Sequence, residues 1–385
     1  MKMKKTVLTL LLATGLIGDS QAGGWPQFRG PDGSGVAREK LPTKLAKENI
    51  KWEIDIPGRG LSSPVIQGDR VFVSAASGPD QSRLHVICLD ANSGRKIWER
   101  QFWATGRTMT HPKTCVAAPT PVIANDKLFV LYSSNDLICL DLDGNLQWLR
   151  GLTLDYPNAS NSLGMSSSPV VVDGVLVVQI ENDSESFAAG INVRSGENLW
   201  KLDRPKAANW TSPTAAVTGG RAVAILQSSK GIHAVNPRSG EEVWYFGGGA
   251  STIPSSTLGP DGTLYVPANG ITALQPGSAT RDVKQLWVSG RLKPGTSSPL
   301  ILGKLIFTMN SSGVLTCGNT VDGDRLWQIR MKGKKFSATP LGCNGYIYAI
   351  NEAGLLQVVD YKGAEGRVIS SLELGEVVLS TPSIA

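Results

Sequence analysis

The sequence contains few histidines, cysteines and aromatic residues for its length. Its 385 residues include three histidines and five cysteines, and aromatic residues make up 6% of the chain. The number of cysteines is odd and none forms a Cys-x-x-Cys pair, so a disulfide framework is not indicated. Three of them, Cys88, Cys139 and Cys317, occupy equivalent places in short apolar runs. There we expect cysteine to serve as a small buried hydrophobe in a strand.

Motifs that identify common enzyme classes are also absent. The chain has no Gly-x-Ser-x-Gly, His-Glu-x-x-His, phosphate-binding loop or dinucleotide fingerprint. No set of residues can be assigned to a metal ion from the sequence, so we predict no metal site.

The chain lacks a strong excess of charge of one sign. The formal net charge is +6, and the first 22 residues contribute three lysines and one aspartate, which leaves the rest of the chain at about +4. A field this weak, without a basic stripe or a nucleic-acid-binding module, argues against nucleic acid as a partner.

Long apolar runs are missing after residue 22. The first 22 residues combine a basic start, an apolar run over 6–18 and a small-residue cleavage site at 20–22, the pattern of a secretory signal. An uncleaved anchor is the alternative. No later segment approaches 18 uninterrupted apolar residues, so we expect no transmembrane segment after cleavage. The expected location is periplasmic or secreted.

Tryptophan, in contrast, recurs at nearly even intervals of 40 to 52 residues. The seven recurring residues are Trp52, Trp98, Trp148, Trp200, Trp244, Trp287 and Trp327. Most follow a glycine turn by four residues. A fixed period of this size indicates one supersecondary unit copied many times.

A second periodic element, Ser-Pro or Thr-Pro, stands at the start of an expected strand in most units. Proline is tolerated there because the first residue of a strand need not donate to the ladder. In the first unit a strand near 63–67, a tight turn, a strand near 70–73, a strand over 84–90 and a strand ending near Trp98 follow one another. The apolar alternation and short β-branched blocks are typical of strands.

Four strands per unit, repeated radially, predict an all-β fold, a β-propeller. Seven units are complete. An outer-strand signature at 51–55 and an inner-strand signature at 379–385 have no partners of their own and predict an eighth, incomplete blade closed by both ends of the chain. We infer either a truncated eight-bladed ring or a ring that leaves an exposed sheet edge prone to association. The expected organisation is a signal over 1–22, an extended N-terminal segment over 23–47 and the propeller over 48–385.

The tryptophans have two possible roles. A large aromatic at one place in each blade can fill the wedge between neighbouring sheets, and we prefer this blade-docking role because aromatic rings dominate core energetics. A row of ligand-stacking rings is the alternative.

The repeats LDANSGRKIW, INVRSGENLW and VNPRSGEEVW resemble the repeat of the pyrroloquinoline-quinone (PQQ)-type propeller family. The resemblance covers roughly residues 48–385. The segment from Trp25 to Gly35, the pair His111 and Lys113, and Trp210 with the residues to Pro213 resemble a secreted bacterial branch of that family. Members of this branch commonly continue beyond the segment that ends at Ala385, which agrees with the missing strands.

The resemblance implies two different functions. Quinoprotein dehydrogenases of the family hold PQQ with Ca²⁺ over the channel, whereas the propeller lipoprotein of the outer-membrane β-barrel assembly machinery is not an enzyme. The vicinal disulfide of PQQ alcohol dehydrogenases, a Cys-x-x-Cys-His haem motif and a matching carboxylate and amide set for Ca²⁺ are missing here. The lipid-bearing cysteine of the assembly lipoprotein is missing too.

The first candidate site is the longest insertion between units, from Trp103 to Ala117. It contains His111 and Lys113, which could bind a ligand at a channel mouth, and a histidine merely solvated in a polar loop is the alternative. Cys115 near His111 suggests a nucleophile pair only weakly, because no third orienting group is visible.

The second candidate site combines Glu181 and Asp183 with Arg204 and Trp210 at the next junction between units. The two carboxylates could bind a cation or act as a base. The alternative is a solvated acidic loop paired with Arg204.

These observations favour an exported, non-catalytic propeller, expected to be monomeric, that binds an envelope protein or a small ligand at a channel mouth. The alternative is a PQQ-dependent oxidoreductase with Ca²⁺. Hydrolase or lyase action at the channel mouth is a third hypothesis, and Glu181 and Asp183 would carry it.

Overall fold

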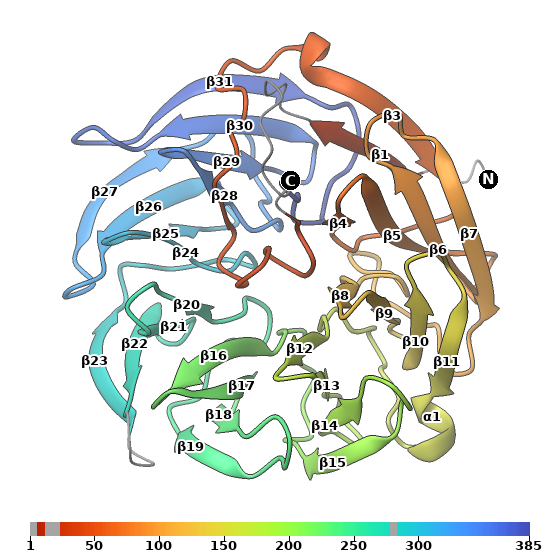
Figure 1. Ribbon diagram of the computed structural model, residues 1–385. Coiled ribbons are helices and arrows are strands. Elements are labelled where there is room, and N and C mark those ends of the chain that lie inside the picture. Colours follow the sequence, from red (N-terminus) through yellow and green to blue (C-terminus); the bar gives the residue numbers. More distant parts are fainter. Residues whose placement is uncertain (1–5, 12–23, 278–282) are drawn as a thin grey trace.

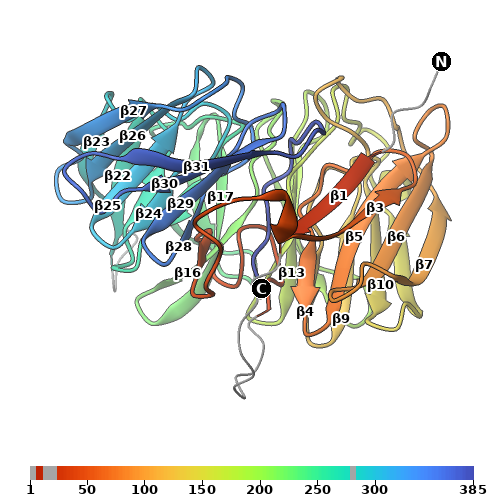
Figure 2. The ribbon, with the colours of Figure 1, turned by 90° about the horizontal axis from the view of Figure 1, so that it is seen from above.

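A computed structural model describes residues 6–11, 24–277 and 283–385. Seven sheets, each built on four antiparallel strands, follow one another around a central axis, as Figure 1 shows face-on and Figure 2 shows after a turn of 90°. The predicted β-propeller with seven complete blades is confirmed. The signal expected over 1–22 lies outside the described residues, apart from one short strand.

Each blade runs from an inner strand near the axis to an outer strand at the rim. Blades 1 to 4 are β4 (Val65–Gln67), β5 (Arg70–Ser77), β6 (Arg83–Asp90), β7 (Lys96–Trp103); β8 (Val122–Ala124), β9 (Lys127–Leu131), β10 (Asp136–Asp141), β11 (Leu146–Gly151); β12 (Val170–Val172), β13 (Val175–Ile180), β14 (Phe187–Asn192), β15 (Asn198–Asp203); and β16 (Thr214–Thr218), β17 (Arg221–Ser228), β18 (Gly231–Val235), β19 (Glu242–Phe246). Blades 5 to 7 are β20 (Thr257–Leu258), β21 (Leu264–Val266), β22 (Ile271–Pro276), β23 (Val283–Ser289); β24 (Leu300–Leu302), β25 (Leu305–Met309), β26 (Val314–Asn319), β27 (Arg325–Arg330); and β28 (Leu341–Cys343), β29 (Tyr346–Ile350), β30 (Leu355–Asp360), β31 (Arg367–Glu373).

The third and outer strands of every blade meet at a β-bulge in the same place. In blade 1 the register shifts between Cys88 and Leu89, and Cys88 pairs directly with Trp98. The corresponding partner of Trp200 is Gly190, where an added Cβ would lie 2.1 Å from the indole nitrogen. The residue opposite the indole must therefore be small, which explains cysteine at this slot.

The periodic tryptophans pack between blades. The Trp52 indole lies against Gly94 of blade 1, whose φ of +71° suits glycine and whose added Cβ would come within 2.7 Å of the ring. Its Nε1 donates to the Ala91 carbonyl at 2.9 Å. The pairs with the same ring-on-glycine contact are Trp98 with Gly144, Trp148 with Gly196, Trp200 with Gly240, Trp287 with Gly323, and Trp327 with Gly366. Trp244 is fully buried in a cluster shared with blade 5.

The start of each inner strand is joined to the next blade by a hydroxyl group. The backbone N–H of Ser63 donates to the Thr120 hydroxyl at 3.0 Å, and the backbone N–H of Thr120 donates to the Ser168 hydroxyl at 2.9 Å. Five more bonds of 2.9 to 3.1 Å continue the series as far as Thr381. We call these residues the hydroxyl ring: Ser63, Thr120, Ser168, Ser212, Ser255, Ser298, Thr339 and Thr381.

The ring has eight members because the two ends of the described chain share an eighth position. Both views place β3 (Ile50–Ile56) between β31 and β5, paired antiparallel with β1 (Thr6–Leu11). Thr381, near the C-terminus, supplies the innermost residue, and the Ser383 hydroxyl donates to the Pro64 carbonyl at 2.6 Å. The predicted incomplete blade is therefore present in part: its outer strand at 51–55 is confirmed as β3, whereas residues 379–385, expected as the inner strand, lie at the inner position without forming a strand.

The segment from Trp25 to Ala37 crosses the centre of the ring, running from blade 1 to blade 7 (Figure 1). Trp25 bridges Ile66 of blade 1, and β2 (Val36–Ala37) pairs in parallel with β28. Between them the buried Arg29 guanidinium donates to the Thr257 hydroxyl at 2.6 Å and the Ser256 carbonyl at 2.8 Å. Burial lowers the pKa of Arg29 to about 10. The segment therefore closes one end of the channel.

Helix is confined to short turns in the described residues. They are η1 (Lys47–Asn49) and α1 (Leu152–Asp155), the latter in the connection between blades 2 and 3. The periodicity of the sequence did not predict α1, because one turn is too short to establish a helical pattern. No helix among the described residues has the length and apolar character needed to cross a membrane.

Candidate functional site

A chamber of about 460 Å³ occupies the channel on the side where the inner strands begin. All eight members of the hydroxyl ring line it, and Phe28 of the crossing segment forms part of its floor. The loops that connect successive blades form its rim. The chamber thus ends at the crossing segment on one side and faces the loops on the other.

The chamber wall is rich in hydroxyl groups and poor in charge. Of its described lining residues, the side chains that can carry charge are His111 and Lys113, and none is a carboxylate or an amide. Its apolar part includes Leu61, Leu163 and Ile253. This wall can donate hydrogen bonds and bury apolar surface.

His111 and Lys113 lie at the rim, where the first candidate site placed them. The Lys113 Nζ pairs with Glu352 of blade 7 at 3.1 Å, so the insertion reaches across the mouth. The His111 Nδ1 lies 3.1 Å from the Lys113 backbone nitrogen, which donates to it. This contact leaves Nε2 as the protonated nitrogen of the neutral ring.

Trp210 forms one wall of the chamber. Its Nε1 donates to the Gly164 carbonyl at 3.0 Å, and its backbone N–H donates to Thr252 at 2.8 Å. The indole is held by both neighbouring connections, so the ring contributes a fixed apolar surface to the chamber.

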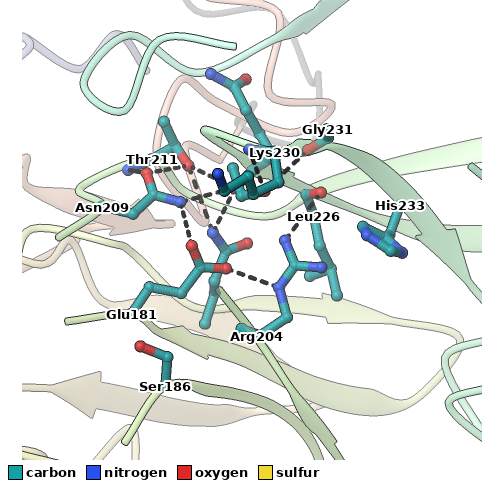
Figure 3. Close-up of polar contacts among 12 residues, drawn as sticks. Glu181, Ser186, Arg204, Asn209, Thr211, Leu226, Lys230, Gly231 and His233 are labelled. Carbon is teal, nitrogen blue, oxygen red and sulfur yellow. Dashed lines mark hydrogen bonds and ion pairs between the residues drawn. The ribbon is translucent and has the colours of Figure 1, made fainter. Parts of the chain in front are cut away.

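The other charged candidates do not line the chamber. Glu181 accepts from the Arg204 Nε at 2.7 Å and from the Asn209 amide at 2.8 Å, as Figure 3 shows. We call these three residues the Glu181 cluster. The side chains of Glu181 and Arg204 are 1% and 3% exposed. Burial raises the pKa of Glu181, although the charge of Arg204 opposes the shift.

The expectation of a solvated acidic loop is therefore wrong for Glu181, although the predicted pairing with Arg204 is present. The cluster is buried at the junction of blades 3 and 4. Glu181 follows β13 and bridges Asn209 in the connection between the blades, and Arg204, which follows β15, donates to the Leu226 carbonyl of β17 at 3.4 Å. Asp183 is exposed and accepts a bond from the Ala208 backbone at 3.3 Å. No group of three or more His, Cys, Asp or Glu residues suited to a metal ion occurs in the described part of the chain.

Cys115 is not poised as a nucleophile. It is fully buried, and burial raises the pKa of its thiol to about 12. At neutral pH the thiol is protonated, whereas the reactive form of cysteine is the thiolate.

A third polar group, which sequence reasoning missed, joins three strands of blade 1. The Ser77 hydroxyl lies 2.7 Å from the His85 Nε2, and the His85 Nδ1 lies 2.8 Å from Glu99. Burial acts to raise the pKa of Glu99, but hydrogen bonds from Lys96 and His85 leave it below its ordinary value. The connectivity is that of a Ser-His-acid triad. His85 is 2% exposed, and Ser77 does not line the chamber.

The sequence also failed to indicate the ring hydroxyls and Phe28 as chamber residues. The Ser-Pro and Thr-Pro repeats were the available signal, since equivalent residues at the start of every inner strand must converge on the axis of a propeller.

Comparison with known proteins assigns the chain to a family. The sequence profile described as "Outer membrane protein assembly factor BamB" matches residues 44–161 and 82–246, more than half of the chain. The chain belongs to this family of PQQ-like propellers. A polyvinylalcohol dehydrogenase of Sphingopyxis sp. (strain 113P3) is 26% identical over 171 residues, 41% of this chain and 24% of that protein. The outer membrane protein assembly factor BamB of Moranella endobia (strain PCIT) is 24% identical over 200 residues, 50% of this chain and 46% of that protein.

The fold is shared with a solved dehydrogenase structure. A europium-containing methanol dehydrogenase superposes with a TM-score of 0.69 at 13% identity, covering 93% of this chain and 87% of that one. The aligned part of this chain spans less than half the length of either curated relative. These likenesses confirm the family resemblance and the propeller, and they include both dehydrogenases and assembly factors.

The residues of the chamber do not fit PQQ with Ca²⁺. Calcium takes about six to eight oxygen ligands, with carboxylates and amides among them. The described chamber wall offers neither group, and its basic side chains are His111 and the already paired Lys113.

Proposed function

We propose that this protein is a non-catalytic binding propeller of the cell envelope, and that its binding site is the chamber with its rim. The chamber carries the proposal, because its hydroxyl groups can hold a ligand and the described contacts of His111 include no serine, threonine or cysteine side chain that it could activate. The candidates with catalytic chemistry support the same conclusion. Glu181 is held by Arg204, and the Cys115 thiol is buried and protonated.

The rim offers a surface for a partner protein. Met109 and Leu163 are 58% and 44% exposed in the connections around the mouth, and Ile253 is 46% exposed. Exposed apolar groups around a polar cavity are typical of interaction sites. The membership of BamB in the same family supports a partner in the envelope.

A reconstitution assay tests the non-catalytic part of the proposal. The purified protein is incubated with PQQ and Ca²⁺, and quinone-dependent dye reduction is followed with a panel of alcohols. We expect no reduction above a heat-denatured control, while a known quinoprotein dehydrogenase treated in parallel regains activity. Turnover that requires both PQQ and Ca²⁺ would overturn the proposal in favour of an oxidoreductase.

Site-specific crosslinking tests the binding face. A photoreactive residue replaces Met109 at the mouth or, as a matched control, Val321, which is 75% exposed in a turn at the opposite face. We expect a defined crosslinked product in cells from position 109 and none from position 321. Equal crosslinking from both faces would contradict the assignment of the mouth.

Ester hydrolysis is a second candidate function, favoured by the Ser77–His85–Glu99 arrangement alone. We place it second because His85 is buried and Ser77 does not line the chamber. A serine-directed fluorophosphonate probe decides the question. We expect no labelling, and labelling that Ser77→Ala abolishes would favour a hydrolase.

A further inference from the structure

We propose that the chamber binds a small organic carboxylate, with its oxygens at the hydroxyl ring and its apolar part against Trp210. This inference rests on the proposed binding function and adds the chemistry of the ligand.

The hydroxyl protons of the ring have no acceptor among the described protein groups. Along the series from Thr120 to Thr381, each hydroxyl oxygen accepts from the backbone N–H of the preceding blade. A hydroxyl group can also donate its proton. Among the described residues no ring hydroxyl donates a bond to another protein group, so these protons remain free for a ligand that accepts.

Ser63 is the clearest case of a ring hydroxyl that lacks a hydrogen-bond partner. It is 2% exposed and lines the chamber, yet its hydroxyl oxygen has no hydrogen-bond partner among the described residues. Leaving a buried polar group unpaired costs about 1–3 kcal/mol, so such a group calls for an explanation. A ligand oxygen at the ring would accept the bond from Ser63. The Thr114 hydroxyl, also in the chamber wall, is unpaired in the same way.

The rest of the wall limits the ligand to an acceptor of low charge. Cations and amines are held best by carboxylate or amide oxygens, and the described side chains of the wall include none. A sugar both donates and accepts hydrogen bonds. In this wall its donating protons would find mainly other hydroxyl groups as side-chain acceptors. A doubly charged phosphate would face one lysine, Lys113, that Glu352 already neutralises. A singly charged carboxylate suits the donor-rich wall best.

The apolar wall determines the remainder of the ligand. Trp210, Leu163 and Ile253 lie on the side of the mouth, and Phe28 lies at the floor. The chamber volume of about 460 Å³ is within the range of small-molecule sites. A ring or short alkyl chain attached to the carboxylate would therefore lie against Trp210.

Two variants separate ligand binding from folding. Ser63→Ala removes a hydroxyl that makes no bond within the described protein, so its melting temperature should match that of the wild type. Ser167→Ala is the matched control, because Ser167 is equally buried and also unpaired but does not line the chamber.

The experiment is a titration with 4-fluorophenylacetate followed by ¹⁹F NMR, with 4-fluorophenylacetamide as the uncharged comparison. We expect saturable binding of the acid, binding of the amide weaker by about tenfold or more because charge-assisted bonds are lost, and a severalfold loss for Ser63→Ala only. Absent binding of the acid, equal binding of acid and amide, or equal behaviour of the two serine variants would overturn the carboxylate site. PQQ-dependent turnover and crosslinking at the mouth are measured separately. A failure of the carboxylate test therefore does not decide the proposed binding function, which those two experiments test.

Discussion

The chamber and the Glu181 cluster lie close together in the ring, yet their polar groups are used in opposite ways. In the cluster, Glu181 is engaged by Arg204 and Asn209 and is shielded from solvent. In the chamber, the ring hydroxyls from Thr120 to Thr381 accept one bond each and keep a proton free, and the Ser63 hydroxyl has no partner among the described residues. The charged residues thus pair with one another at the junction of blades 3 and 4, while residues of modest polarity line the open site. Residue type alone is a poor guide to which group is free to react or bind.

Breaking the buried ion pair should give the largest effect on stability. Arg204→Met leaves the Glu181 carboxylate buried without its cation, so we expect the free energy of unfolding to fall by about 3–5 kcal/mol. Urea denaturation measures the change. The double variant with Glu181→Met should recover most of the loss, because neither charge then remains buried. A single variant as stable as the wild type would show that the cluster is not structural.

The hydroxyl ring should show a smaller effect that differs between its members. Ser168→Ala leaves the Thr120 N–H without an acceptor, so we expect a loss of about 1–3 kcal/mol. Ser63→Ala should be nearly neutral, because no described donor uses its oxygen. Thermal unfolding of both variants checks the difference. Equal destabilisation would mean that Ser63 takes part in the closed ring and is not free for a ligand.

The pH dependence of stability provides a third comparison. The pKa of Glu181 is raised in the folded protein, so the folded state binds its proton more tightly than the unfolded state. The contribution of this group should therefore be greatest at low pH, decline as pH rises from the ordinary glutamate value through the raised one, and stay constant above it. Glu181→Gln should remove this decline from unfolding curves recorded across that window. An unchanged slope would contradict the assigned cause.

The smallest effect should come from the rim. The ion pair between Lys113 and Glu352 is 58% exposed on the lysine side, so Lys113→Met should change stability by less than about 1 kcal/mol. The same change should make the connection around His111 exchange its amide hydrogens faster, because its tie to blade 7 is lost. Exchange that stays as slow as in the wild type would show that other contacts hold the insertion in place.

The sequence predicted the ring and half of its candidate site. Strand periodicity and the spacing of tryptophan are local patterns repeated many times, so the blades and the incomplete eighth position followed from them. His111, Lys113 and Trp210 line the chamber because long connections between blades meet at its mouth, and their role as ligand-binding residues stays a prediction. The burial of Glu181 depends on how two blades pack, which a single repeat does not reveal. The convergence of the ring hydroxyls and the path of the crossing segment also arise only when the ring closes.

A crystal structure of the protein with 4-bromophenylacetate would show whether the chamber binds a carboxylate, since the anomalous signal of bromine locates the ligand. We expect one dominant bromine position beside Trp210 inside the chamber, with the carboxylate toward the hydroxyl ring and within hydrogen-bonding distance of Ser63. Bromine bound only on the outer surface, or a carboxylate directed at the solvent while the ring hydroxyls remain unpaired, would contradict this expectation.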